Sequence, residues 1–250
     1  DLRAALDTRQ IEVHYQPQID IRTGRLKQFE ALVRWRHPQR GLVSPAEFIP
    51  LSEEIGLIDR LGAYVLYTAC RDAAAWPADV SVAVNLSAVQ FRKGQLVNLV
   101  RAALSESGLE PHRLELEITE GVMLTDSASV LEQLHQLKRL GVRISLDDFG
   151  TGYSSLSYIR SFPFDKIKID QSFVRELGDS PDSLAIIRAV VGLCSSLGIA
   201  TTAEGVETVA QLDILTREHC DSVQGWLFGK AVPQDEARTL LRTFPLNQAA

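Results

Sequence analysis

Segments with the pattern of a β-strand alternate with segments of helical pattern along nearly all of this 250-residue chain. The predicted strands occupy residues 11–17, 26–35, 80–85, 113–120, 142–148, 166–170, 199–204 and 222–226. The predicted helices occupy residues 45–76, 98–107, 127–140, 154–161, 182–197, 208–218 and 235–242. Alternating β and α segments imply a parallel sheet covered by helices, and their number favours a (β/α)8 barrel over an open doubly wound sheet.

Glycine and proline residues mark several of these boundaries. Gly108, Gly141 and Gly198 each follow a helical pattern, at the position where a glycine commonly ends a helix. Pro17 is expected to stop the first strand, and residues 1–10 to form a helix or a linker before it. No change of composition divides the chain, so residues 1–250 are expected to form a single domain.

Charge and composition limit the partners of this chain. The formal net charge of −6 and the pI of about 5.4 argue against broad binding to nucleic acids or anionic membranes. There is no signal peptide and no long apolar run, and Cys70, Cys194 and Cys220 lack the spacing of a disulfide framework or a zinc site. We therefore expect a cytoplasmic domain. Because the chain begins with Asp1, we also expect it to be cut from a longer multidomain signalling protein, whose other parts can carry a membrane anchor.

Polar residues stand at the carboxyl end of almost every predicted strand. They are Glu30, Asn85, Glu117, Glu120, Asp147, Asp148, Lys168, Asp170, Glu204, Glu207 and Gln224. In a barrel of parallel strands these ends converge on one face, where active sites are built. Alternation supports this placement, because Lys166 and Lys168 share one face of their strand and the isoleucines beside them share the other.

The acidic members of this set require a compensating cation. They are Glu30, Glu117, Asp147, Asp148 and Glu204. Carboxylates brought together in this way repel one another, and hard oxygen ligands suit Mg²⁺ or Mn²⁺, with Asn85 as a neutral oxygen donor. Two such ions roughly 3.5–4 Å apart, bridged by a carboxylate, are a common apparatus for hydrolysing a phosphodiester. Asp147 is the candidate bridge.

Several individual assignments stay open at this point. Lys168 either holds the attacking water or neutralises developing charge, and Glu204 either accepts a proton or ligates the second ion. Taken alone, Asp147 and Asp148 are equally compatible with a solvated turn before a helix. Arg34 fits a phosphate-binding residue as well as a surface strand residue, and Gln16 fits a ligand contact as well as a polar strand end.

Motifs along nearly the whole chain resemble one known family. Glu30-Ala-Leu-Val-Arg-Trp35 resembles the signature of the EAL domain, the bacterial cyclic di-GMP phosphodiesterase. The other matching segments are Tyr15-Gln-Pro17, Pro45–Pro50, Asn85-Leu-Ser87, Glu117-Ile-Thr-Glu120, Asp147–Leu156, Lys168-Ile-Asp170, Ala203–Glu207 and Gln224-Gly225. The resemblance implies a modified TIM (β/α)8 barrel with one antiparallel strand near the N-terminus. It also implies hydrolysis of one bond of cyclic di-GMP, dependent on two Mg²⁺ or Mn²⁺ ions, to give linear pGpG.

The resemblance further implies roles for single residues. Those implied as metal ligands are Glu30, Asn85, Glu117 and Asp147 for the first ion and Asp147 and Asp148 for the second, with Glu204 close by. Lys168 is similar to the family's catalytic lysine, which together with Glu30, Asp147 and Glu204 forms the implied catalytic set. Those implied to bind substrate are Gln16, Leu32, Arg34, Asp148, Asp170, Glu207 and Gln224. Glu120 matches a glutamate that steadies the loop after Asp148, which the family uses in catalysis and in communication across a dimer.

The resemblance also suggests a homodimer and an upstream sensory or GGDEF-type domain. Three positions depart from the family pattern: Gln18 stands where isoleucine is frequent, Trp226 where tyrosine or phenylalanine is usual, and Ala231 where proline is common. None of them is an implied metal ligand.

Three functions are compatible with these residues. The first is an active cyclic di-GMP phosphodiesterase, and the second is a catalytically silent receptor that binds cyclic di-GMP and signals to a partner. Degenerate receptors typically lose the acids of the metal site or the following loop, and both are present here, which favours the enzyme. The third is a barrel enzyme that uses Mg²⁺ to stabilise an enolate, which would share the acidic ring.

Overall fold

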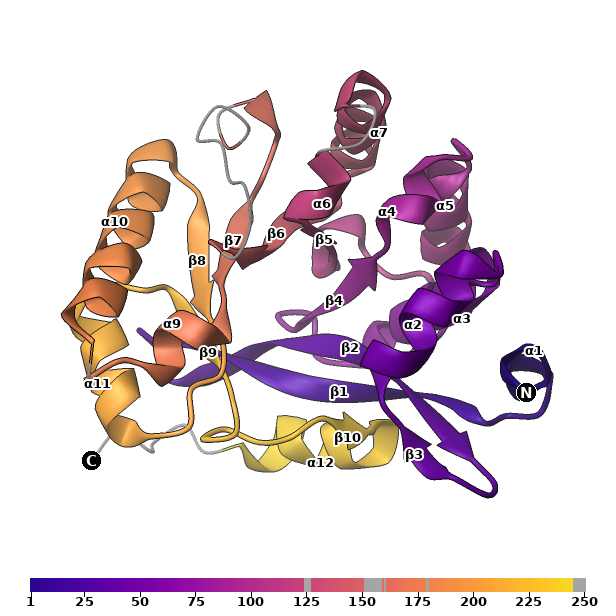
Figure 1. Ribbon diagram of the computed structural model, residues 1–250, viewed down its shortest axis with the longest axis horizontal. Coiled ribbons are helices and arrows are strands. Elements are labelled where there is room, and N and C mark those ends of the chain that lie inside the picture. The colour runs from indigo at the N-terminus through magenta and orange to yellow at the C-terminus, as the bar shows by residue number, and fades with distance from the viewer. Residues whose placement is uncertain (124–126, 151–158, 160, 179, 245–250) are drawn as a thin grey trace.

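The chain forms a closed barrel of eight strands surrounded by helices, in a computed structural model that describes residues 1–123, 127–150, 159, 161–178 and 180–244 (Figure 1). The barrel strands are β1 (Ile11–Asp20), β2 (Arg25–His37), β4 (Ser81–Leu86), β5 (Leu114–Thr119), β6 (Arg143–Phe149), β7 (Lys166–Ile169), β8 (Ala200–Ala203) and β9 (Ser222–Gln224). Neighbouring strands pair in this order, and β1 closes the ring by pairing with both β2 and β9. Two short strands, β3 (Gly41–Val43) and β10 (Val232–Pro233), lie beside β2 and β1 outside the ring.

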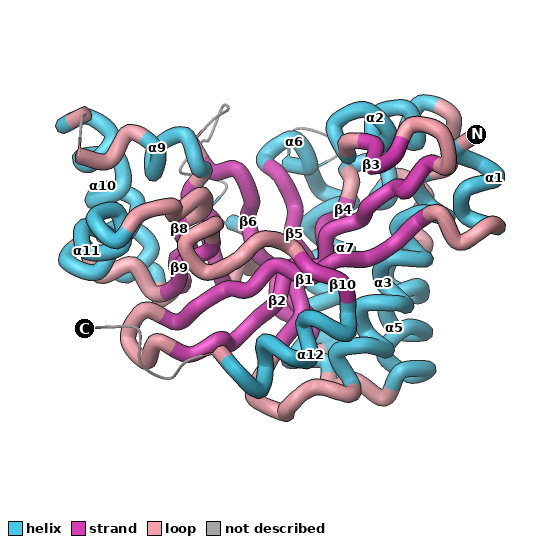
Figure 2. Tube along the Cα trace, turned by 90° about the horizontal axis from the view of Figure 1, so that it is seen from below, coloured by secondary structure: helices cyan, strands magenta, loops and turns pink. Residues whose placement is uncertain are grey.

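Helices cover the outside of the barrel. They are α1 (Leu2–Asp7), α2 (Pro45–Glu54), α3 (Ile58–Ala74), α4 (Ala88–Phe91), α5 (Leu96–Ser107), the 3-10 helix η1 (Pro111–Arg113), α6 (Glu120–Met123), α7 (Ser127–Leu140), α9 (Gln171–Arg175), α10 (Pro181–Leu197), α11 (Val209–Arg217) and α12 (Gln234–Thr243). In Figure 1, α3, α5 and α7 lie on one side of the strands and α10 and α11 on the other. Figure 2 shows α12 running below β1 and β10. None of the helices in the described ranges is both long and apolar enough to cross a membrane.

One strand of the barrel runs against the others. β1 is antiparallel to β2 and to β9, whereas β2 and β4 to β9 are mutually parallel. This confirms the barrel with a single antiparallel strand near the N-terminus. The prediction that Pro17 stops β1 is wrong, because the strand continues to Asp20. On one side of β1, residues 14 and 15 pair with β10 and residues 18–20 pair with β9. Pro17 lies in the gap between them, where a missing N–H breaks no ladder bond.

The predicted helix over residues 45–76 is in fact two helices. It breaks at residues 55–57, where Gly56 adopts a φ of +70°, a conformation that costs glycine no side-chain clash. The left-handed glycines predicted after helices are present, with Gly108 at φ +68° after α5 and Gly198 at φ +70° after α10. The helix expected over 154–161 falls largely outside the described residues.

The main apolar core lies between the strands and the outer helices. Tyr15, Phe29 and Trp76 form one fully packed part of it, with the Tyr15 and Phe29 ring centroids 5.1 and 5.0 Å from that of Trp76. The Tyr15 hydroxyl donates a 2.6 Å hydrogen bond to Asp72 on α3, which satisfies both buried polar groups. Strand residues on the opposite face point into the barrel, and many of them are polar, such as Glu30, Glu117 and Lys168. The candidate site is therefore built inside the ring of strands.

Candidate active site

A buried lysine stands at the centre of the predicted acidic ring. Lys168 on β7 is 1% exposed, and its Nζ lies 2.7 Å from Glu204 Oε1, 2.9 Å from Glu117 Oε2 and 3.0 Å from Asp147 Oδ1. Glu30 Oε2 is 3.6 Å away. These acids come from β2, β5, β6 and the segment after β8, so the barrel gathers residues that are distant in sequence. Ile167 and Ile169 are fully buried on the opposite face of β7, as strand alternation predicts.

Glu30 is held by two side-chain amides. Asn85 Nδ2 donates to Glu30 Oε1 at 2.6 Å, and Gln224 Nε2 donates to Glu30 Oε2 at 2.6 Å. Burial alone would favour the neutral carboxyl, but the charge of Lys168 and these two hydrogen bonds lower the pKa of Glu30 below its ordinary value. Glu30 is therefore an anion held in one orientation.

The paired aspartates sit at an irregularity in β6. The pairing of β6 with β7 shifts register between Leu146 and Phe149, and Asp148 adopts a left-handed φ of +54°. Consecutive residues of a regular strand point to opposite faces, whereas a bulge re-aims them. As a result, carboxylate oxygens of Asp147, Asp148 and Glu204 all lie within 4.8 Å of one another.

The acids of the site outnumber its buried cation. Burial, together with the charges of Glu30 and Asp147, raises the pKa of Glu117 well above its usual value, although Lys168 opposes the rise. Burial also raises the pKa of Glu204 to about 8 and raises the pKa of Asp148, to which the neighbouring charge of Asp147 contributes. The same carboxylates overcome the burial of Lys168 and raise its pKa, so the lysine is charged. Lys168 alone therefore does not neutralise the site.

The residues of the site fit divalent cations. Glu117 Oε1 is buried and has no hydrogen-bond partner among the described residues, so it is available as a ligand atom. The oxygens of Asp147, Asp148 and Glu204 form a second group close enough to share one ion. All of these are hard carboxylate oxygens, and no histidine or cysteine belongs to either group, as expected for Mg²⁺ or Mn²⁺.

A cavity of about 240 Å³ opens beside these acids. Its lining includes the predicted residues Gln16, Glu30, Leu32, Glu204, Glu207 and Gln224. It also includes Gln171, Arg175, Gly205, Gly225 and Trp226, which had no predicted role in a site. Gln171 and Arg175 belong to α9, a short helix that had not been predicted. Trp226 could have been singled out from the sequence, because it departs from the family pattern. Its side chain is 61% exposed, and Lys230 Nζ lies 4.5 Å from its ring centroid.

Three further predicted residues make local contacts. Arg34 is half-buried and donates to the carbonyl oxygen of Val33 at 2.9 Å. Asp170 caps α9 by accepting a 2.9 Å hydrogen bond from the Ser172 amide. Glu120, the first residue of α6, accepts a 3.0 Å hydrogen bond from the amide of Gly150, two residues after Asp148. Residues 151–156 of the loop lie outside the described part of the chain.

The raised pKa of Glu204 predicts how the stability of the metal-free protein depends on pH. Between the ordinary pKa of 4.5 and about 8, the folded chain keeps a proton that the unfolded chain releases. The free energy of unfolding should therefore fall as pH rises, by about 1–2 kcal/mol between pH 6 and 8. Urea unfolding in EDTA measures this slope, which should flatten in Glu204→Gln. An identical slope in that variant would assign the effect to another group.

Comparison with known proteins places this chain in a family. A sequence profile described as "EAL domain" matches residues 1–231. The bifunctional diguanylate cyclase/cyclic di-GMP phosphodiesterase MucR of Pseudomonas aeruginosa is 47% identical over 240 residues, covering 94% of this chain and 35% of MucR. The cyclic di-GMP phosphodiesterase NbdA of the same organism is 42% identical over 253 residues, covering 100% of this chain and 32% of NbdA.

Solved structures agree with this relationship. The structure of the MucR phosphodiesterase in complex with cyclic di-GMP superimposes with a TM-score of 0.91 at 47% identity, covering 95% of this chain and 98% of that one. The chain spans about a third of the length of the curated relatives MucR and NbdA. A family match over most of the chain, the identity to these relatives and the shared barrel lead to one conclusion: this chain belongs to the EAL domain family.

Proposed function

We propose that this chain is a cyclic di-GMP phosphodiesterase that hydrolyses one phosphodiester bond to give linear pGpG. The observation that carries the proposal is the gathering of carboxylates from four parts of the barrel around Lys168, in excess of its charge. The names of the relatives supply the substrate class, because MucR and NbdA are cyclic di-GMP phosphodiesterases and the MucR structure holds cyclic di-GMP.

Two divalent cations are part of the proposal. Glu30, Asn85, Glu117 and Asp147 would hold one ion, and Asp147, Asp148 and Glu204 the other. When bound, such a pair supplies charge that stabilises a phosphodiester transition state. It also lowers the pKa of a bound water molecule, so that hydroxide is available at neutral pH. Two observations support this assignment: Glu117 Oε1 has no hydrogen-bond partner in the described part of the chain, and the oxygens of Asp147, Asp148 and Glu204 cluster.

The residues of the chain divide into those that hold charge and those that hold the substrate. Lys168 keeps a fixed positive charge beside the reacting phosphate and orients the attacking water by hydrogen bonding. Accepting the proton of that water is the alternative role of Glu204, in place of ligating the second ion. Cyclic di-GMP would enter the cavity beside Glu30, with Gln16, Leu32 and Gln224 lining its inner part and Glu207 its exposed rim.

The remaining substrate contacts come from outside the cavity lining. Arg34 would pair with a phosphate, since its guanidinium is half-buried and its only hydrogen bond in the described structure is to a backbone carbonyl. Asp170 would act near the cavity by holding α9, which carries Gln171 and Arg175. Glu120 would hold the start of the loop after Asp148 through the amide of Gly150.

Incubating the purified chain with cyclic di-GMP and Mg²⁺, followed by chromatography of the nucleotides, tests the proposal. We expect linear pGpG to appear, and EDTA to abolish its formation. A calorimetric titration of cyclic di-GMP into the metal-free protein provides the control for binding. Binding without turnover at saturating Mg²⁺ or Mn²⁺ would overturn the enzyme and favour the silent receptor.

The cellular setting is also a proposal. We place the domain in the cytoplasm, in a longer protein with an upstream sensory or GGDEF-type domain, and as a homodimer. The buried free thiols of Cys70, Cys194 and Cys220 are compatible with a reducing compartment. The relative MucR is a bifunctional diguanylate cyclase/cyclic di-GMP phosphodiesterase, and this chain covers 35% of it. Light scattering on the purified chain distinguishes a dimer from a monomer.

A further inference from the structure

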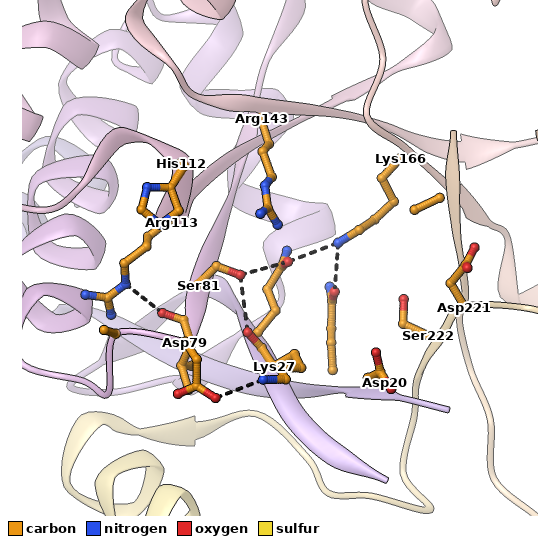
Figure 3. A pocket seen from close by; sticks show the side chains of 15 residues that line it. Asp20, Lys27, Asp79, Ser81, His112, Arg113, Arg143, Lys166, Asp221 and Ser222 are labelled. Carbon is orange, nitrogen blue, oxygen red and sulfur yellow. Dashed lines mark hydrogen bonds and ion pairs between the residues drawn. The ribbon is translucent and has the colours of Figure 1, made fainter. Parts of the chain in front are cut away.

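A second polar cluster lies inside the barrel, nearer the amino ends of β2 and β7 than the candidate active site. The proposed reaction does not use it. Lys166 Nζ lies 2.8 Å from Glu115 Oε1, 3.0 Å from Gln28 Oε1 and 3.5 Å from Gln18 Oε1. Gln28 Nε2 donates to the same Glu115 oxygen at 2.8 Å. All four side chains are buried. Gln18, Gln28 and Lys166 border a pocket of about 320 Å³, and Figure 3 shows Lys166 and Arg143 reaching into it from neighbouring strands.

Two glutamine side chains connect this cluster to the candidate active site. Gln18 stands directly opposite Gln224 in the antiparallel pairing of β1 with β9. Gln18 Nε2 donates to Gln224 Oε1 at 2.8 Å, and Gln224 Nε2 donates to Glu30 Oε2 at 2.6 Å and to Gln16 Oε1 at 3.2 Å. A continuous buried chain of hydrogen bonds therefore runs from Lys166 through both amides to Glu30.

The two ends of this chain determine the orientation of both amides. A carboxylate such as Glu30 only accepts hydrogen bonds, and an ammonium such as Lys166 only donates them. The Gln224 amide must therefore turn its nitrogen to Glu30 and its oxygen to Gln18. The Gln18 amide must in turn present its nitrogen to Gln224 and its oxygen to Lys166. Rotation of either amide by half a turn would place two acceptors or two donors against each other.

From this geometry we propose that Gln18 is a positioning residue, which holds the amide of Gln224 so that its nitrogen binds Glu30. The inference rests on the proposed function, because its consequence is the orientation of Glu30 as a cation ligand. Without Gln18, the oxygen of Gln224 loses its buried donor, so the amide is no longer held at both ends and its nitrogen can move away from the Glu30 carboxylate. Ligand-orienting groups of this kind typically contribute about 10- to 100-fold to metal affinity.

The test compares two buried glutamines of similar exposure. Gln18 is 2% and Gln28 is 4% exposed, both contact Lys166, and of the two only Gln18 contacts Gln224. We expect Gln18→Met to weaken Mn²⁺ binding by about tenfold and Gln28→Met to change it less than about twofold. Electron paramagnetic resonance of free Mn²⁺ measures the affinity, and circular dichroism checks that each variant is folded. Equal affinities for Gln18→Met and the wild type would overturn the proposal.

A second comparison separates positioning from a general loss of packing. If Gln18 acts through Gln224, then adding Gln18→Met to Gln224→Met should leave the Mn²⁺ affinity of Gln224→Met unchanged. A further tenfold loss in the double variant would contradict the proposal. The side-chain amide resonance of Gln224, assigned by its disappearance in Gln224→Met, should also shift in metal-free Gln18→Met. Because these readouts need no turnover, failure of cyclic di-GMP hydrolysis would reject the proposed function and leave this inference to be judged separately.

Discussion

Asp147→Asn is expected to lower the rate of cyclic di-GMP hydrolysis by roughly 10³-fold, the upper end of what removing one charge-stabilising group costs. Asp147 Oδ1 lies 3.0 Å from Lys168 Nζ, and a carboxylate oxygen of Asp147 lies within 4.8 Å of those of Asp148 and Glu204. Asp147 is therefore the acid placed to bind both proposed ions. An amide of nearly the same shape keeps the packing but removes the anionic charge. Glu30→Ala should cause a comparable loss, because it removes the ligand held by Asn85 and Gln224.

Initial rates of pGpG formation at saturating Mg²⁺ measure this effect. Asp79→Asn is the matched control, since Asp79 lies outside the site and pairs with Lys27 at 2.8 Å on the surface. It should retain the wild-type rate within about twofold, as expected for an exposed ion pair. A rate near that of the wild type in Asp147→Asn would show that the proposed ligand set is wrong.

Lys168→Met is expected to destabilise the metal-free protein by about 3–5 kcal/mol, the cost of removing one partner of a buried ion pair. Lys168 is the cation nearest to the carboxylates of Glu117, Asp147 and Glu204, and its loss leaves them buried without compensation. Two conditions should restore part of the lost stability. Mg²⁺ supplies positive charge, and a lower pH protonates Glu204, whose pKa is already raised to about 8. The rate should fall at least about 10²-fold even with Mg²⁺, because the fixed charge beside the phosphate is absent.

Lys166→Met is the matched control for this variant. Lys166 is a buried lysine on the same strand, two residues earlier, and pairs with Glu115 at 2.8 Å away from the proposed metal ligands. Its substitution removes no charge from the proposed ion sites, so Mg²⁺ should restore none of the lost stability. Urea unfolding of both variants under both conditions therefore isolates the contribution of Lys168. If Mg²⁺ rescued the two variants to the same extent, or neither of them, the placement of the cations beside Lys168 would be refuted.

The alternation of strands and helices was readable from the chain because it depends on local periodicity. The strands around Glu117, Lys168 and Glu204 and the glycine-terminated helices were found close to their predicted positions. The gathering of acids at one end followed from the geometry of parallel strands, since their carboxyl ends meet. The orientation of β1, by contrast, came only from the resemblance to a family. Nothing in the local pattern of residues 11–20 indicates the direction of its neighbours.

The cavity and the deeper polar chain could not be predicted from strand ends. α9 and Trp226 line the cavity but follow the observed ends of β7 and β9, although the predicted last strand extended to Trp226. Gln18 was noted in the sequence as an unusual residue with no role assigned to it. Its contact with Gln224 spans 206 positions and arises only when β1 pairs with β9.

Residue type and spacing along this chain were sufficient to establish a barrel with acids at its carboxyl face, because periodicity and hard-ligand chemistry are local properties. They placed Asp147 and Asp148 at the same strand end but did not explain how both reach one site, since alternation alone would send the two side chains to opposite faces of β6. The register shift between Leu146 and Phe149 and the left-handed backbone of Asp148 turn both carboxylates toward Glu204. That bulge forms where β6 must pair with β7 across a closed ring, so it depends on contacts between strands that no single segment contains.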